Sequence, residues 1–329
     1  LALNFFENYM KGEHDNHNCD IRIISMFERS SRILFNEFPP EGSSPINGDS
    51  PPVNVAIFGS GNLAQSMIIR LARLGHYANF KKIKITLFHN EDKIIRKMHQ
   101  NFPGLMDLIE FENINEPLEL FDVEEFNIRQ EKQAFNQVYL LCENDHLSSN
   151  ILKKLIKNNS TQPTNVVLTL INPNGILSKW YHIEKIGNIK LSKFNIIEKS
   201  FTKEALISEK IDELAKIIHQ DYLDKLSDEA KKDGKPSRQD WDLLPIDFKN
   251  QNREQADHIQ IKIKLAGYEY GPGSKARDVE SNIEIPEDLI ETLAKVEHNR
   301  WEAHMILSGW VQGELRDDDK KIHTDLIPY

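Results

Sequence analysis

The stretch VNVAIFGSGNLAQSMIIRLARLGH, residues 53–76, decides the fold. A short apolar run is followed by a glycine turn, and the turn is followed by apolar residues at helical spacing. The turn fits the pattern G-x-G-x-x-A, formed by Gly59, Ser60, Gly61, Asn62, Leu63 and Ala64. In such a turn the first glycine permits a tight bend, the second lets the backbone approach a pyrophosphate, and the alanine lets the helix pack closely on the sheet. The stretch therefore predicts a Rossmann-type domain whose first helix presents free N–H groups to a phosphate.

Three further apolar runs, at residues 83–88, 137–142 and 165–171, are typical of buried strands. Helical stretches separate most of these runs. Strands that alternate with helices favour a parallel sheet covered on both faces. The predicted fold class is therefore α/β, with a Rossmann-like parallel-sheet domain followed by a mainly helical C-terminal part.

The rest of the chain organises around this domain. An amphipathic helix is expected over residues 21–38, and a linker rich in Pro, Gly and Ser follows it. The apolar face of that helix, from Ile23 to Leu34, has no obvious partner in its own segment, which favours a homodimer. Later helices are expected over 202–226, 252–267 and 286–308. The predicted parts are an N-terminal helix and linker (1–50), a Rossmann domain (51–200), a helical connector (201–280) and a small C-terminal domain (281–329).

Composition excludes several classes of protein. The 329 residues carry a formal net charge of −10, and no basic cluster is visible that would bind duplex nucleic acid. The two cysteines, Cys19 and Cys142, lie too far apart in the sequence to suggest a disulfide framework, and no apolar run approaches the length of a membrane span. We therefore expect a cytoplasmic protein. Because the chain begins at Leu1 and ends abruptly at Tyr329, we also expect a fragment of a longer protein.

The second predicted strand ends without the acid that an NAD site uses to bind the ribose hydroxyls. His89 and Asn90 stand there, and Glu91 and Asp92 come late. His89 suits a ribose 2′-phosphate or another nucleotide, so the expected cofactor is NAD(P) or another adenine nucleotide. The alternative is a Rossmann scaffold without dinucleotide turnover. Because the sequence shows no convincing hydride-transfer site, we assign no catalytic residue.

The segments RSSRILFNEFPP (29–40) and VAIFGSGNLAQSMIIRLARLGH (55–76) resemble bacterial proteins that carry a TrkA-N domain, the nucleotide-binding Rossmann domain of potassium-transport regulators. The segments 214–223 and 243–267 resemble the helical part of such chains. The resemblance implies a TrkA-N-like domain over 51–200, a homodimer, and a membrane channel or an upstream membrane segment as partner.

A second motif, HNRWEAHMILSGW, occupies residues 298–310. His298 and His304 are six residues apart, so they point about 120° away from each other on a helix and do not form a metal site. Gly309 suits a left-handed helix cap, which folds Trp310 back onto the last turn. Trp301 and Trp310 then form either a piece of core or a stacking pocket for a flat ligand, and their spacing alone favours neither.

The segments IPEDLIETLAKVEHNRWEAHMILSGW (285–310) and GELRDDDKKIHTDLIPY (313–329) are similar to the ryanodine-receptor (RyR) repeat, although Thr324 stands where that pattern has proline. Repeats of this family are non-catalytic and can bind adenine nucleotides. The resemblance implies an RyR domain over 281–329. The implied ligand pocket consists of Glu297, His298, Trp301, Trp310 and His323.

Together these patterns predict a non-catalytic nucleotide-sensing regulatory protein that acts in the cytoplasm, at the cytosolic face of the membrane. Its binding of a nucleotide would control an ion channel, a transporter or a signalling partner. Two alternatives remain open. One is an NAD(P)-dependent oxidoreductase, and the other is a scaffold whose pockets are both empty.

Overall fold

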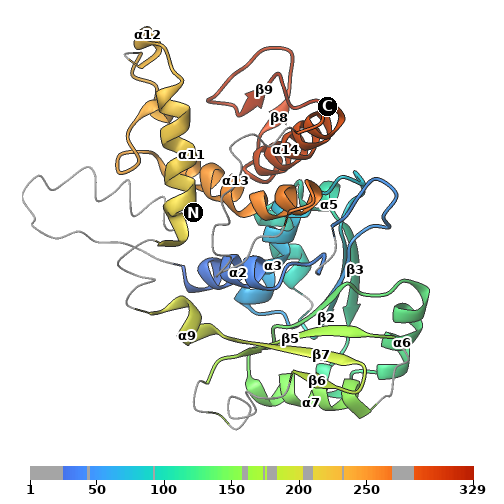
Figure 1. Cartoon of the computed structure of the whole chain (residues 1–329). Helices are drawn as coiled ribbons and strands as arrows, with labels where there is room; N and C mark the ends of the chain where they lie inside the picture. The colour runs from blue at the N-terminus through green and yellow to red at the C-terminus, as the bar shows by residue number, and fades with distance from the viewer. Residues whose placement is uncertain are drawn as a thin grey trace, which may run out of the picture.

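The computed structural model describes residues 25–42, 45–91, 93–157, 162–172, 175, 184–202, 210–231, 233–268 and 285–329. Cys19 and the first residues of two expected helices, at 21–24 and 203–209, lie outside these ranges. A parallel sheet with helices on both faces forms one part of the molecule (Figure 1). The C-terminal helices pack against one of its helical layers (Figure 1).

The sheet has seven strands in the order β3-β2-β1-β4-β5-β7-β6. All neighbours are parallel except β6, which pairs antiparallel with β7 at one edge. The strand order reverses between β1 and β4, and this switch point is where open α/β sheets bind ligands. The predicted parallel α/β class is confirmed. The strands are β1 (Asn54–Phe58), β2 (Lys84–His89), β3 (Glu110–Asn115), β4 (Gln137–Leu140), β5 (Thr164–Leu170), β6 (Lys185–Ile186) and β7 (Ile189–Asn195).

Alternate residues of β1 face two separate cores, because side chains of a strand point to opposite faces. Val55 and Ile57 pack with the helices on one face, and Ala56 and Phe58 pack with those on the other. The first face is covered by α2 (Met26–Glu37), α3 (Asn62–Leu74), α4 (Ile94–Asn101) and α5 (Leu105–Leu108). The second face is covered by η1 (Leu118–Leu120), α6 (Val123–Lys132) and α7 (Asp145–Lys157). The short helix α9 (Ile196–Ser200) follows β7.

Helix α2 is not the exposed amphipathic helix that the sequence suggested. It packs against α3, α9 and α13, and Leu34 and Phe35 are buried. The apolar residues of α2 therefore find their partners within the same chain. The argument for a homodimer that rested on an unpartnered face is wrong.

The C-terminal part contains η2 (Lys210–Asp212), α11 (Glu213–Asp224), α12 (Asp228–Lys231), η3 (Pro236–Arg238), α13 (Ile246–Leu265), α14 (Glu287–Leu307), β8 (Val311–Gln312) and β9 (Ile322–His323). Helix α14 matches the helix expected over 286–308, and α13 begins six residues before the expected 252. Both helices contact α3 (Figure 1). Among the described helices, none combines the length and the apolar character needed to cross a bilayer.

Candidate functional site

The glycine turn adopts the conformation that its sequence predicts. Gly59 has a φ of +123°, and a β-carbon there would lie 2.5 Å from the carbonyl oxygen of Leu141, so only glycine fits. Gly61 is the N-cap residue of α3 and makes no side-chain cap hydrogen bond. Leu63 and Ala64 are buried in the core, Ser60 is buried in the turn, and Asn62 is exposed. The turn therefore offers a ligand its backbone and the Asn62 side chain.

A carboxylate that the sequence analysis missed lies over this turn. Glu143 follows β4, and a β-carbon on Gly61 would lie 2.9 Å from its Cγ and 3.0 Å from its Oε1. The positive end of the α3 dipole attracts an anion at this place, and Glu143 supplies one from within the chain. A pyrophosphate bound at Gly61 would meet this carboxylate and be repelled by it. The turn thus has the backbone of a dinucleotide site, but Glu143 disfavours a dinucleotide there.

His89 ends β2 as predicted but is buried. Its Nδ1 accepts a hydrogen bond from the backbone N–H of Glu91 at 3.1 Å, so the proton sits on Nε2. Nε2 then donates to Oδ1 of Asn113 on the neighbouring strand β3. Both ring nitrogens are engaged within the protein, whereas Asn90 beside His89 is exposed. In this arrangement His89 orients the end of the strand and offers no free nitrogen to a ribose.

A buried carboxylate joins α3 of the Rossmann-like sheet part to α14, the helix that carries most of the motif at residues 298–310. Glu254 of α13 accepts from Arg73 of α3 at 2.9 Å and contacts His304 of α14 at 2.7 Å. Arg300 of α14 lies 3.7 Å away. Burial alone would raise the pKa of Glu254, but the charges of His304, Arg73 and Arg300 together hold it well below its usual range. Helices α3, α13 and α14 are therefore held together by one ionised group.

Glu297, expected in the ligand pocket, belongs to the same helix interface. Its carboxylate pairs with Arg300 at 2.8 Å and with Lys262 of α13. Burial raises its pKa, but these two cations outweigh burial and lower the pKa to about 2. Both carboxylate oxygens are thus used inside the protein, and the structure places Glu297 between α13 and α14.

The other four expected pocket residues come together with the last residue of the chain. We call His298, Trp301, Trp310, His323 and Tyr329 the aromatic cluster. The ring of His323 lies edge-on to both indoles, with centroids 5.2 Å from Trp301 and 5.9 Å from Trp310. The ring of His298 lies 5.6 Å from those of Trp301 and Tyr329.

The predicted helix cap shapes this cluster. Gly309 has a φ of +84°, its N–H donates to Ile306, and the N–H of Trp310 donates to the carbonyl of Met305 at 3.0 Å. These two hydrogen bonds form a Schellman cap, which turns Trp310 back as expected. Because His323 occupies the space beside both indoles, a flat ligand would reach Trp301 and Trp310 from solvent, where each is only half-buried.

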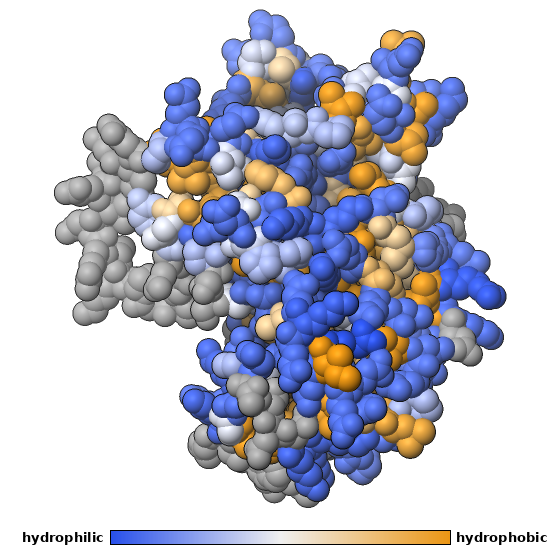
Figure 2. All heavy atoms as spheres, turned by 90° about the vertical axis from the view of Figure 1, so that its right-hand side faces the viewer, coloured by the Kyte–Doolittle hydropathy of each residue, from blue (hydrophilic) through white to orange (hydrophobic). Residues whose placement is uncertain are grey.

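Figure 2 shows the surface on the right-hand side of Figure 1, where apolar residues form small separate groups among hydrophilic ones. Exposed apolar side chains of the C-terminal part include Ile290, Val311, Leu315 and Ile327. Single exposed apolar residues are ordinary on a protein surface and do not by themselves indicate a partner.

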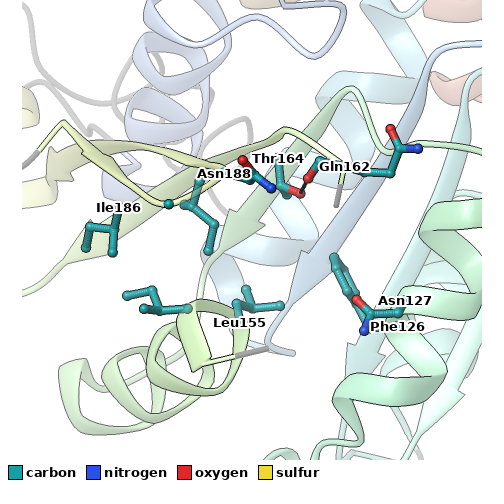
Figure 3. Close-up of a pocket in the computed structure, with 10 residues that line it drawn as sticks. Phe126, Asn127, Leu155, Gln162, Thr164, Ile186 and Asn188 are labelled. Carbon is teal, nitrogen blue, oxygen red and sulfur yellow. Dashed lines mark hydrogen bonds between the residues drawn. The ribbon is translucent and has the colours of Figure 1, made fainter. Parts of the chain in front are cut away.

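A cavity of about 390 Å³ lies elsewhere, at the amino ends of β5 and β7 (Figure 3). It contains none of the expected site residues. Ligands of α/β sheets usually bind at the opposite, carboxyl ends of the strands. Its lining is uncharged and consists of Phe126, Asn127, Leu155, Ile156, Gln162, Thr164, Ile186, Gly187, Asn188 and Ile189.

In the part of the chain that the structure describes, no group of three or more His, Cys, Asp or Glu side chains is arranged to hold a metal ion. Comparison with known proteins finds no matching family model, no matching curated protein and no matching solved structure. The resemblances to TrkA-N and RyR domains rest on the quoted segments alone.

Proposed function

We propose that this chain is a non-catalytic regulatory protein that binds an adenine nucleotide at the aromatic cluster. The observation that carries the proposal is the meeting of His298 and Trp301 on α14 with Trp310 after the cap and His323 on β9. Half-buried indoles offer stacking surfaces to a base, and each stacked ring contributes roughly 1–3 kcal/mol. The likeness to the RyR repeat supports the same ligand class.

The position of α14 supports a sensing role. The helix that carries the cluster is joined to α3 through Glu254, which contacts Arg73 on one side and His304 on the other. Helix α3 begins at the glycine turn, at the switch point of the sheet. A shift of α14 on ligand binding would therefore change the contacts of α3, the helix that begins at this switch point. Such a rearrangement would alter a partner surface without any chemical step.

The likeness to TrkA-N domains supports a membrane channel or a transporter as the partner. In this proposal the chain acts as a homodimer in the cytoplasm, at the membrane, on a channel or transporter. Light scattering with and without nucleotide tests the assembly. A monomer under both conditions contradicts the dimer.

Thermal unfolding with AMP, ADP, ATP, NAD⁺ and NADP⁺ tests the ligand class. The proposal expects at least one adenine nucleotide to raise the melting temperature, because a ligand that binds only the folded state stabilises it. Nicotinamide absorbance in the presence of candidate alcohols and acids should stay constant. Steady oxidation or reduction of the nicotinamide would make the chain an oxidoreductase. If no nucleotide raises the melting temperature, the proposal fails and the alternative of a scaffold with two empty pockets is favoured.

A further inference from the structure

The two nitrogens of His323 make contacts that one neutral imidazole cannot satisfy. Nδ1 lies 3.1 Å from the backbone nitrogen of Asp325, and Nε2 lies 3.3 Å from Nη1 of Arg316. Both neighbours are donors only, whereas a neutral imidazole has a single acceptor nitrogen. Only one of the two contacts can therefore be a hydrogen bond.

The backbone contact is the better hydrogen bond of the two. It is shorter, and the amide of Asp325 is fixed two residues along the chain from the ring. Nδ1 then accepts, and the proton sits on Nε2. The Nε2–H of His323 and an N–H of Arg316 consequently face each other as two donors.

The guanidinium is held in this position from its other side. Nε of Arg316 donates to Oδ1 of Asp318 at 2.7 Å, and Nη2 lies 3.4 Å from Oδ2, which leaves Nη1 directed at His323. The side chain of Arg316 is 57% exposed, so a ligand can approach it from solvent. Because Asp318 offsets its charge, the arginine contributes directed hydrogen bonds more than a net positive field. That arrangement suits one phosphate group better than a chain of several.

We propose that Arg316 and His323 together bind the phosphate of a nucleoside monophosphate whose base stacks on an indole of the aromatic cluster. A phosphate oxygen that lies beside this pair of nitrogens accepts from both donors and removes their conflict. The His323 ring lies 5.2 Å from Trp301 and 5.9 Å from Trp310, so phosphate and base sites adjoin. This assignment rests on the proposed function and adds which part of the nucleotide is recognised.

Calorimetric titration of the full chain with AMP and with adenosine tests the assignment. Wild type should bind AMP about tenfold more tightly than adenosine, because a charge-assisted hydrogen bond to phosphate is lost with adenosine. Arg316→Ala should remove this preference and leave the affinity for adenosine unchanged. Lys320→Ala is the matched control, since it removes the same charge from the same loop but from a side chain that pairs with Asp317.

The outcomes separate this assignment from the proposed function. If wild type binds AMP and adenosine equally well, the phosphate site is refuted while nucleoside binding stands. If Lys320→Ala loses as much AMP affinity as Arg316→Ala, the effect is general electrostatics and the assignment fails. If wild type binds neither compound while another adenine nucleotide raises its melting temperature, the assignment alone fails; if no adenine nucleotide raises it, the proposed function fails as well. Melting curves of both variants should match that of wild type, because both side chains are mostly exposed.

Discussion

Replacing Glu254 with glutamine tests whether one buried carboxylate holds α14 onto the Rossmann part. The substitution keeps the volume and removes the charge that Arg73, Arg300 and His304 share. Breaking a buried ion pair by removing one partner costs about 3–5 kcal/mol. Arg300 keeps its ion pair with Glu297. The side chain of Arg73 is 24% exposed and can reach water. The low end of this energy range therefore applies. We expect a loss of about 3 kcal/mol in the free energy of unfolding.

Urea denaturation followed by circular dichroism measures this loss as a lower midpoint. Glu287→Gln on the first turn of α14 is the control, because that side chain is exposed and its loss costs about 1 kcal/mol or less through the helix dipole. A loss for Glu254→Gln no larger than that of the control would refute the argument. Helix α14 would then be held by its apolar contacts, and coupling through Glu254 would have no basis.

Three further predictions follow from the sites. Burial raises the pKa of Glu297 but its two paired cations lower it to about 2, so its pairs stabilise the fold above about pH 4.5 and this contribution is lost as the pH falls towards 2. Acid titration of Glu297→Gln should therefore show a shallower decline in the unfolding free energy over that window, and an unchanged decline contradicts the pairing. Gly59→Ala should cost at least about 2 kcal/mol through its φ of +123° and a backbone clash, whereas Gly61→Ala should cost less than about 1 kcal/mol because only an exposed carboxylate must move. Equal midpoints for the two variants in urea would contradict this difference. Trp301→Ala should weaken AMP binding at least about fivefold in calorimetry. An unchanged affinity together with a loss of about 3–5 kcal/mol in the free energy of unfolding would instead show that this indole belongs to the hydrophobic core.

Local patterns predicted the elements that carry their own start and stop signals. The glycine turn sets β1 and α3, and α14 runs between Pro286 and the cap at Gly309 as expected. Strand β3, Glu110–Asn115, was missed because its sequence EFENIN is mainly polar and partly exposed at the edge of the sheet. Strand β7, Ile189–Asn195, was also missed, since pairing with β5 defines it more than its own composition.

The candidate site was predictable only where neighbouring residues share an element. His298 and Trp301 meet through helical spacing, and the cap places Trp310. The position of His323 beside both indoles came from the family resemblance, because no spacing rule spans the intervening loop. Glu143 gave no local signal, since its approach to the glycine turn depends on the pairing of β1 with β4.

The partners of Glu297 were hidden for a related reason. Arg300 lies three residues along the same helix, a spacing that sequence reasoning can recognise. Lys262 comes from α13, and that contact depends on how two helices pack. The sequence therefore placed Glu297 on the correct helix but not in the interface that uses its carboxylate.

Native mass spectrometry tests the central claim most directly. The folded chain is incubated for several hours with an equimolar mixture of AMP, ADP, ATP, NAD⁺ and NADP⁺, and both the adducts and the free nucleotides are weighed. The account predicts a one-to-one adduct of a single adenine nucleotide, no change in the mass of any nucleotide, and a smaller fraction of adduct in Trp301→Ala. Conversion of a nucleotide to a product, or the absence of any adduct on the wild type, would contradict it.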